Sequence, residues 1–105
     1  MLHITNKNFE SDVVKSELPV LIDFSAPWCA PCHMMSPVFE ELEKEFQGNL
    51  VFGKINTDDD PGLAQRFQIT GIPCLVLTKD GKEQSRIVGF MGKEALKERI
   101  ESMIK

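Results

Sequence analysis

The residues of this chain best suited to chemistry are two cysteines, Cys29 and Cys32, separated by Ala30 and Pro31. Two thiols at this spacing can lie within one helical turn, where they can close to a disulfide and open again. One thiol would attack a disulfide of another molecule, and the other would resolve the mixed disulfide. The pair could instead be structural, or half of a zinc site. A zinc site normally needs a second Cys or His pair at suitable spacing, and the sequence contains none, so redox chemistry is favoured.

The position of Cys29 supports a redox function. It follows an apolar run at residues 18–24 and precedes a helical pattern, so it is expected at the N-terminus of a helix. The free N–H groups and the helix dipole there favour a thiolate over a thiol, and the thiolate is the nucleophile in disulfide exchange. Pro31 would lie in the first helical turn, where a proline loses no hydrogen bond and stiffens the loop.

The elements that must position the pair are predicted to alternate between strands and helices. Strands are expected at residues 2–4, 18–24, 50–55, 74–78 and 86–88, and helices at residues 8–15, 29–46, 61–67 and 93–105. Pro37 is expected to kink the second helix, Asp60 to cap the third, and residues 79–82 to form a hairpin turn. The order β-α-β-α-β-α-β-β-α predicts one α/β domain over residues 1–105, a mixed sheet with helices on both faces.

Composition narrows the classes of function. The chain has 105 residues and a net charge of −4, from 12 basic and 16 acidic residues. A weakly acidic chain lacks the excess of positive charge that is typical of proteins that bind nucleic acid or an anionic membrane surface. The N-terminal residues lack the basic and apolar regions of a signal peptide, and no apolar run reaches membrane-spanning length. We therefore expect a cytoplasmic protein. In the cytoplasm thiols are kept reduced, and a cysteine pair is more often catalytic or metal-binding than structural.

Further residues extend the pattern around the cysteine pair over essentially the full chain. They are Leu21 to Phe24, Ala26, Trp28 to Cys32, Met34, Pro37, Lys54, Asn56, Asp58, Gly71 to Pro73, Asp80, Gly81, Val88 and Gly89. In this order and spacing the chain resembles the thioredoxin family. The resemblance implies the thioredoxin fold and a protein-disulfide reductase without a bound cofactor, whose electrons are carried by the Cys29–Cys32 pair. Its implied partners are a thioredoxin reductase and target proteins that contain disulfides, and a monomer is expected.

The resemblance also implies roles for individual residues. Cys29 is implied to be the exposed nucleophile, and Cys32 the buried resolving thiol. Asp23 is a buried acid that assists proton transfer at Cys32, Lys54 lies near that acid, and Pro73 is a cis-proline facing the dithiol. The residues themselves allow a solvent-facing Lys54 and an Asp23 that reaches solvent, but an aspartate within an apolar strand is unusual, and burial would raise its pKa. The apolar docking surface around Cys29 is implied to comprise Trp28, Ala30, Pro31, Ile72, Pro73, Gly89 and Phe90, although a tryptophan is more often a core residue.

Four positions depart from the family pattern: Ala30, His33, Cys74 and Phe90. The family usually has a glycine, a lysine, a threonine and a small residue there. The changes near the pair leave open a specialised oxidoreductase with a dedicated target, or an oxidase. Cys74 could supply a third sulfur to an alternative disulfide, a metal or an iron–sulfur centre. Strand alternation places residues 73 and 74 on opposite faces, which favours a small buried apolar residue at Cys74.

Overall fold

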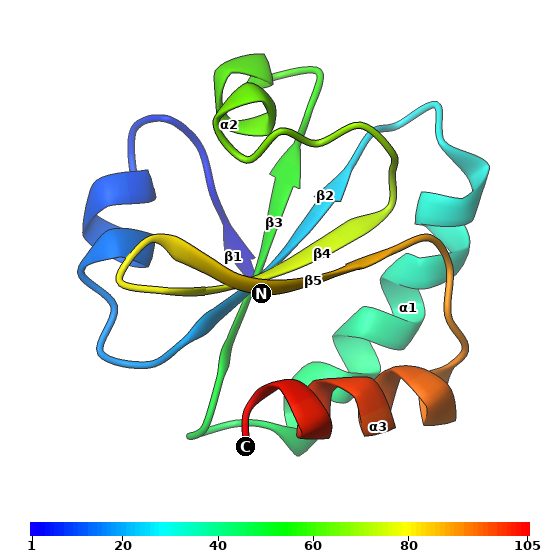
Figure 1. Ribbon diagram of the computed structural model, residues 1–105. Coiled ribbons are helices and arrows are strands. Elements are labelled where there is room, and N and C mark those ends of the chain that lie inside the picture. The colour runs from blue at the N-terminus through cyan, green and yellow to red at the C-terminus, as the bar shows by residue number, and fades with distance from the viewer.

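The computed structural model describes residues 1–105 and orders the chain around a five-stranded sheet (Figure 1). The strands are β1 (Leu2–His3), β2 (Val20–Ser25), β3 (Val51–Asn56), β4 (Cys74–Lys79) and β5 (Lys82–Val88). The helices are a π-helix (Glu10–Val14), α1 (Ala30–Glu45), α2 (Pro61–Arg66) and α3 (Lys93–Met103). The strand order is β1-β3-β2-β4-β5, with β1 and β2 parallel to β3, and β4 antiparallel to both β2 and β5. The predicted order of elements and the mixed sheet are confirmed.

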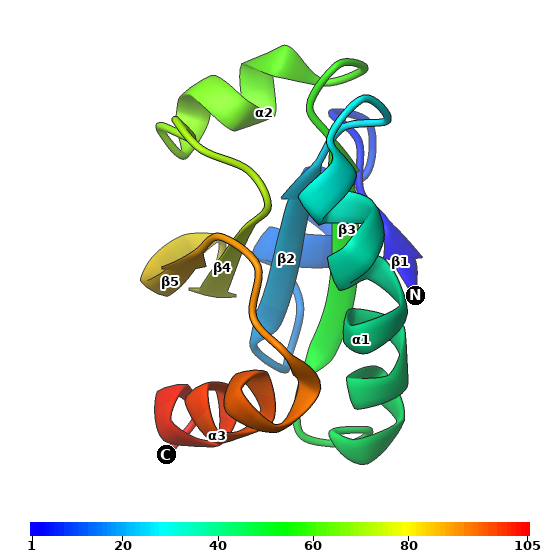
Figure 2. The same ribbon diagram turned by 90° about the vertical axis from the view of Figure 1, so that its right-hand side faces the viewer.

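Two layers of helices cover the two faces of this sheet and enclose separate cores. In Figure 1, α1 and α3 lie on one side, and the π-helix and α2 lie on the other. The core beneath α1 and α3 includes Met35, Phe39 and Leu42 from α1, which recur at helical spacing and are fully buried. Figure 2 shows α1 running alongside the central strands, with α3 across its C-terminal end. No helix is both long and apolar enough to cross a bilayer.

Side-chain alternation along the strands decides which residues face the helix that carries the cysteines. Leu21 of β2 belongs to the core beneath α1, whereas Ile22 and Phe24 belong to the core on the opposite face. Asp23 therefore points toward the α1 face. In β4, Leu75 belongs to the core beneath α1 and Cys74 to the opposite core. The sheet thus separates Cys74 from the face on which Asp23 lies.

Two local expectations differ from the structure, and a third is not tested by it. The segment expected as a helix at residues 8–15 contains a π-helix of five residues, and its wider turn packs both Val13 and Val14 against the core. Asp60 occupies the N-cap position of α2, but its carboxylate accepts a hydrogen bond from the Asn6 N–H at 3.1 Å instead of capping the helix. Pro37 lies within α1, and the kink expected there stays a prediction.

The strand expected at residues 86–88 is longer than predicted and begins at Lys82. Asp80 and Gly81 both have positive φ, 56° and 79°, which are the backbone angles of a tight type I′ hairpin turn. This turn lets β4 and β5 pair directly from Lys79 and Lys82 onward. A Cβ atom on Gly81 would lie 2.6 Å from Val14 Cγ2, so the turn also packs closely on the π-helix.

The hairpin turn yields a test of the fold. Gly81→Ala is expected to lower the free energy of unfolding by about 2 kcal/mol, because the methyl group disfavours positive φ and overlaps Val14. The matched control is Gly62→Ala in α2, where a Cβ meets nothing within 4 Å; it should raise the free energy of unfolding by up to about 1 kcal/mol. Urea unfolding of both variants measures the difference. Equal effects of the two substitutions would contradict the packing of this turn.

Candidate active site

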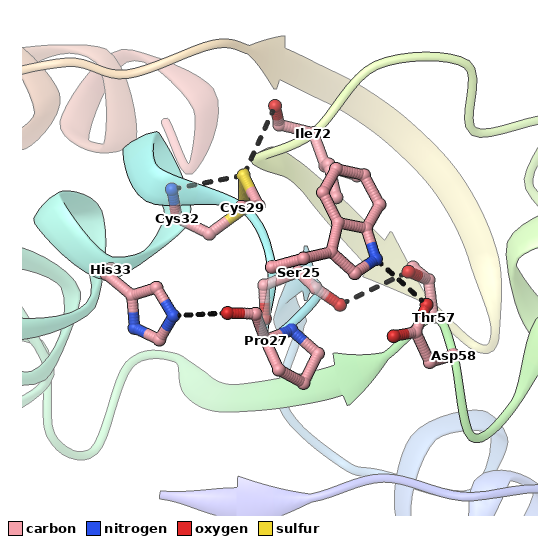
Figure 3. Close-up of a disulfide and its surroundings, with 9 residues drawn as sticks. Ser25, Pro27, Cys29, Cys32, His33, Thr57, Asp58 and Ile72 are labelled. Carbon is pink, nitrogen blue, oxygen red and sulfur yellow. Dashed lines mark hydrogen bonds between the residues drawn. A yellow bond between two sulfur atoms is a disulfide. The ribbon is translucent and has the colours of Figure 1, made fainter.

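The two cysteines lie at the N-terminus of α1, and their sulfur atoms are at bonding distance, closing a disulfide (Figure 3). Cys29 is the N-cap residue, with extended backbone angles (φ −93°, ψ 107°) that turn its side chain back over the first helical turn. There its Sγ accepts a hydrogen bond from the Cys32 backbone N–H at 3.3 Å. The expected placement of Cys29 at a helix N-terminus is confirmed, and the N–H that would stabilise a Cys29 thiolate is identified.

Exposure does not distinguish the two sulfurs. The expectation of an exposed Cys29 is wrong for this disulfide form, since Cys29 is 5% exposed and Cys32 is 4% exposed. Cys29 is covered because the loop before β4 lies against it, with the Ile72 carbonyl oxygen 3.9 Å from its Sγ. What separates the two cysteines is the hydrogen bond from the helix N-terminus, which only the Cys29 sulfur accepts.

The loop that covers the disulfide contains the proline expected opposite the pair. The Ile72–Pro73 peptide bond is cis, as the family resemblance implied, and Pro73 is buried. The Pro73 carbonyl oxygen accepts a hydrogen bond from the Gly89 N–H at 2.8 Å, and Gly89 has a φ of 94°. This hydrogen bond ties Gly89 to the loop whose Ile72 carbonyl lies beside Cys29.

The residues expected to form the docking surface are largely exposed. Trp28 is 71% exposed, which excludes its alternative role as a core residue, and its Nε1–H donates to Asp58 Oδ1 at 3.2 Å. Phe90 is 45% exposed, and Ala30 and Pro31 are also exposed. Beside Trp28 and Ile72 lies a groove of about 190 Å³, also lined by Thr57, Ala64, Ile69 and Thr70, which the sequence analysis did not single out. Met34 and Val88, which were not predicted as part of the docking surface, are two further exposed apolar residues.

Asp23 is the buried acid of the site. It is 1% exposed, and its Oδ1 has no hydrogen-bond partner. Burial raises the pKa of Asp23 to about 6, against the smaller lowering caused by the positive charge of Lys54. Lys54 is the register partner of Asp23 across the β2–β3 pair. The expectation that Lys54 lies near this acid is therefore confirmed.

Lys54 extends from the sheet toward α1. Its Nζ donates a hydrogen bond to Ser36 Oγ and lies 3.5 Å from Glu40 Oε1. The side chain is 20% exposed, so the solvent-facing alternative does not describe it. Ser36 was not predicted as a site residue from the sequence. It lies four residues after Cys32, which is one helical turn along the same stripe of α1.

A polar cleft of about 240 Å³ opens beside Cys32. It is lined by Ser25, Ala26, Pro27, Cys32, His33, Ser36, Lys54 and Asn56. His33 is exposed, as expected for a surface residue, and its Nε2–H donates to the Pro27 carbonyl oxygen at 2.6 Å (Figure 3). The hydrogen bond ties the first turn of α1 to the loop that precedes the disulfide. Solvent thus approaches Cys32 through polar and charged groups, whereas Trp28 and the groove beside it lie next to Cys29.

Cys74 lies apart from this site. It is 1% exposed in the core on the face opposite Asp23, and burial raises the pKa of its thiol. No group of three or more His, Cys, Asp or Glu side chains converges anywhere in the structure. The expected small buried residue describes Cys74, and the third sulfur does not lie where it could join the Cys29–Cys32 pair.

Comparison with known proteins agrees with the geometry. The thioredoxin family model matches residues 1–102. The thioredoxin of Mycobacterium tuberculosis is 42% identical over 103 residues, which are 98% of this chain and 89% of that protein. The chloroplastic thioredoxin M4 of Arabidopsis thaliana is 36% identical over 97% of this chain, and the chloroplastic M-type thioredoxin of Spinacia oleracea is 38% identical over 96%. The chain spans 53% and 56% of the lengths of these two chloroplastic relatives.

The raised pKa of Asp23 predicts how stability changes with pH. Because its pKa rises from 3.8 to about 6 on folding, the folded protein binds more protons than the unfolded chain between these values. Stability must therefore fall as pH rises through this window, and the loss persists at higher pH. Asp23→Asn is expected to raise the free energy of unfolding of the oxidised protein by about 2 kcal/mol at pH 8 and to add little at pH 4.

Urea unfolding at the two pH values measures this difference. The matched control is Asp59→Asn, which changes an exposed aspartate and should give no gain of this size at either pH. A gain for Asp23→Asn that is equal at pH 4 and pH 8 would contradict the raised pKa.

The burial of Cys74 yields a second prediction. Cys74→Ser should leave disulfide reduction and metal content unchanged, because the thiol faces the core opposite Asp23. It should lower the free energy of unfolding by about 1–2 kcal/mol, since a hydroxyl replaces a weakly polar thiol in an apolar core. Cys74→Ala separates loss of the sulfur from introduction of the hydroxyl. A lower turnover for both variants, or a visible absorption band that only the wild type shows, would restore a role for the third sulfur.

Proposed function

The chain belongs to the thioredoxin family of thiol–disulfide oxidoreductases, and we propose that it reduces disulfides in other proteins by cycling Cys29 and Cys32 between dithiol and disulfide. The observation that carries this proposal is the Cys29 sulfur at the α1 N-terminus, hydrogen-bonded by the Cys32 N–H, within a chain that matches the family from residue 1 to residue 102. Only the two sulfurs need to carry electrons, so the proposed cycle uses no bound cofactor.

The first step is attack by the Cys29 thiolate on a sulfur of the target disulfide. The Cys32 N–H and the helix dipole stabilise the negative charge of that thiolate, which raises its population near neutral pH. A bond forms between Cys29 Sγ and the target sulfur, the target S–S bond breaks, and the other target sulfur leaves as a thiolate that takes up a proton. The product is a mixed disulfide.

The second step is resolution of the mixed disulfide by Cys32. We assign the Asp23 carboxylate the role of accepting the Cys32 proton. A buried acid with a pKa of about 6 is mostly ionised at neutral pH, and its pKa lies close enough to that pH for the carboxylate to accept a proton. The Cys32 thiolate then attacks Cys29 Sγ, the bond to the target breaks, and the target leaves as its second thiolate. The target gains two electrons, and the protein keeps the Cys29–Cys32 disulfide. Lys54 would stabilise the ionised form of Asp23.

Target binding is assigned to the exposed residues next to Cys29. Trp28, Phe90 and the flanking apolar residues offer an uncharged surface that suits many unrelated segments. Pro73 has no N–H, and the neighbouring backbone can pair with an extended target chain. Ala30, Pro31, Ile72 and Gly89 complete this surface. The exposed Phe90, where the family usually has a small residue, is expected to narrow the choice of target.

The family also suggests the setting in which the protein works. The proposed partners are a thioredoxin reductase, which would return the disulfide to the dithiol, and proteins with accessible disulfides. We propose a monomer that works in the cytoplasm. The midpoint potential of the Cys29–Cys32 couple tests the direction of electron flow, because a reductase requires a potential more reducing than that of its targets.

Insulin reduction by the chemically reduced protein tests the assignment of the two cysteines. Wild type should turn over insulin disulfides with a chemical reductant in excess, and Cys29→Ser should lose that turnover. Cys32→Ser should lose turnover as well, because the resolving thiol is missing. When this variant is reduced, freed of the reductant and mixed with insulin, it should accumulate a covalent complex with the target that mass spectrometry detects. Cys74→Ser is the matched control, a cysteine-to-serine change off the site, and it should retain turnover. If Cys29→Ser reduced insulin as fast as wild type, the proposal would be wrong.

A further inference from the structure

The position of the Lys54 ammonium is set by α1 and not by the acid opposite it. Cys32, Ser36 and Glu40 follow one another at four-residue intervals, so they lie on one stripe of the helix. Lys54 reaches this stripe from β3, donates to Ser36 Oγ and lies 3.5 Å from Glu40 Oε1. The same lysine is the register partner of Asp23, whose Oδ1 has no hydrogen-bond partner. Contacts with α1 therefore determine how close the Lys54 ammonium lies to the Asp23 carboxylate.

The two helix residues act on Lys54 in different ways. Ser36 is partly buried and lies one turn nearer to Cys32 than Glu40 does. Its hydroxyl is neutral, so it holds the ammonium without cancelling its charge, and the full charge still acts on Asp23. Glu40 is 57% exposed and carries a negative charge, so it attracts the ammonium toward solvent and away from the sheet. The contact with Ser36 opposes that attraction.

We propose that Ser36 is a positioning residue, which holds the Lys54 ammonium near Asp23 against the attraction of Glu40 and so sets how readily Asp23 takes the proton of Cys32. This inference rests on the proposed function, in which Asp23 accepts that proton. It adds a residue that makes no contact with the reacting sulfurs and acts through Lys54 alone.

The direction of the effect follows from the charges. The positive charge of Lys54 lowers the pKa of Asp23, so an ammonium that swings toward Glu40 lowers it less, and the pKa of Asp23 rises. More Asp23 is then protonated at neutral pH, and less of it can accept a proton from Cys32. The other titratable groups around Asp23 and Lys54 in the oxidised protein are His3 of β1, His33 of α1, Cys74 of β4, and Asp59 and Asp60 after β3. Cys32 is held in the disulfide and does not titrate in this form. These groups are the same in every variant compared.

The experiment follows the Asp23 carboxyl directly, by carbon NMR titration of the oxidised protein. Ser36→Ala is expected to lower the acid dissociation constant of Asp23 by about threefold. This is the magnitude expected when the unit charge of the Lys54 ammonium moves away from the carboxyl in surroundings with an effective dielectric constant of about 20. Glu40→Gln should not weaken it, and Ser36→Ala in the Glu40→Gln background should have a smaller effect than in wild type. Ser36→Thr, which keeps the hydroxyl, should restore the wild-type titration.

Ser102→Ala is the matched control, an exposed serine-to-alanine change in α3. It should leave the titration of Asp23 unchanged. If Ser36→Ala also left it unchanged, or if Ser102→Ala moved it equally, the assignment of Ser36 would be overturned. A structural role of Ser36 in helix stability alone would shift the unfolding transition and not the Asp23 titration.

Kinetics separates this inference from the function on which it rests. The pH midpoint for resolution of a Cys29 mixed disulfide should shift upward in Ser36→Ala, in step with the NMR titration. Resolution at the wild-type rate by Asp23→Asn would overturn proton transfer through Asp23, and with it the proposed effect of Ser36 on the reaction. An unchanged Asp23 titration in Ser36→Ala, with slow resolution by Asp23→Asn, would overturn the Ser36 assignment alone.

Discussion

The hydrogen bond from the Cys32 N–H to the Cys29 sulfur is the contact on which the chemistry of this protein depends. It exists because Cys29 occupies the N-cap with an extended backbone, at the point where the chain turns from the end of β2 into α1. The turn is held from both sides, by the hydrogen bond between His33 and the Pro27 carbonyl and by the packing of Met35 and Phe39 on the sheet. A different backbone conformation at Cys29 would turn its sulfur away from the Cys32 N–H and remove the stabilisation of a thiolate.

The burial of Asp23 lowers the stability of the folded protein, but it also raises the pKa of the acid to a value that suits proton transfer. A carboxylate on the face beneath α1, with one oxygen unpartnered, makes the folded protein less stable at neutral pH than an uncharged residue would. Lys54 offsets part of that cost without neutralising the acid, because Ser36 and Glu40 also hold its ammonium. The pKa of about 6 is the balance between burial, which raises it, and this neighbouring charge, which lowers it. If the Asp23 carboxylate were fully paired with a positive charge, the folded protein would be more stable, but Asp23 would be a weaker proton acceptor.

Much of the fold follows from local patterns that one sequence displays. The apolar stripe of α1, the apolar runs of β2 and β4 and the Asp80–Gly81 turn are short-range signals, and all are found in the structure. The full length of β5 was not predicted, because Lys82 to Ser85 are polar on an edge strand and are ordered by pairing with β4. The cis bond before Pro73 and the site near Asp23 came from the family resemblance. The contact of Ser36 with Lys54 depends on how α1 lies over β3, a tertiary relation that no local pattern encodes.

The two cysteines differ in what surrounds them and not in how deeply they are buried. Next to Cys29 lie the Ile72 carbonyl and an apolar groove with Trp28 at its edge, surroundings in which a target segment can displace water. Beside Cys32 a polar cleft brings together His33, Ser36 and Lys54, surroundings in which protons and water can move. An apolar surface suits bond formation with a protein partner, whereas a polar one suits deprotonation of the resolving thiol. The asymmetry of the reaction thus arises from the environments on the two sides of one disulfide, with the first turn of α1 between them.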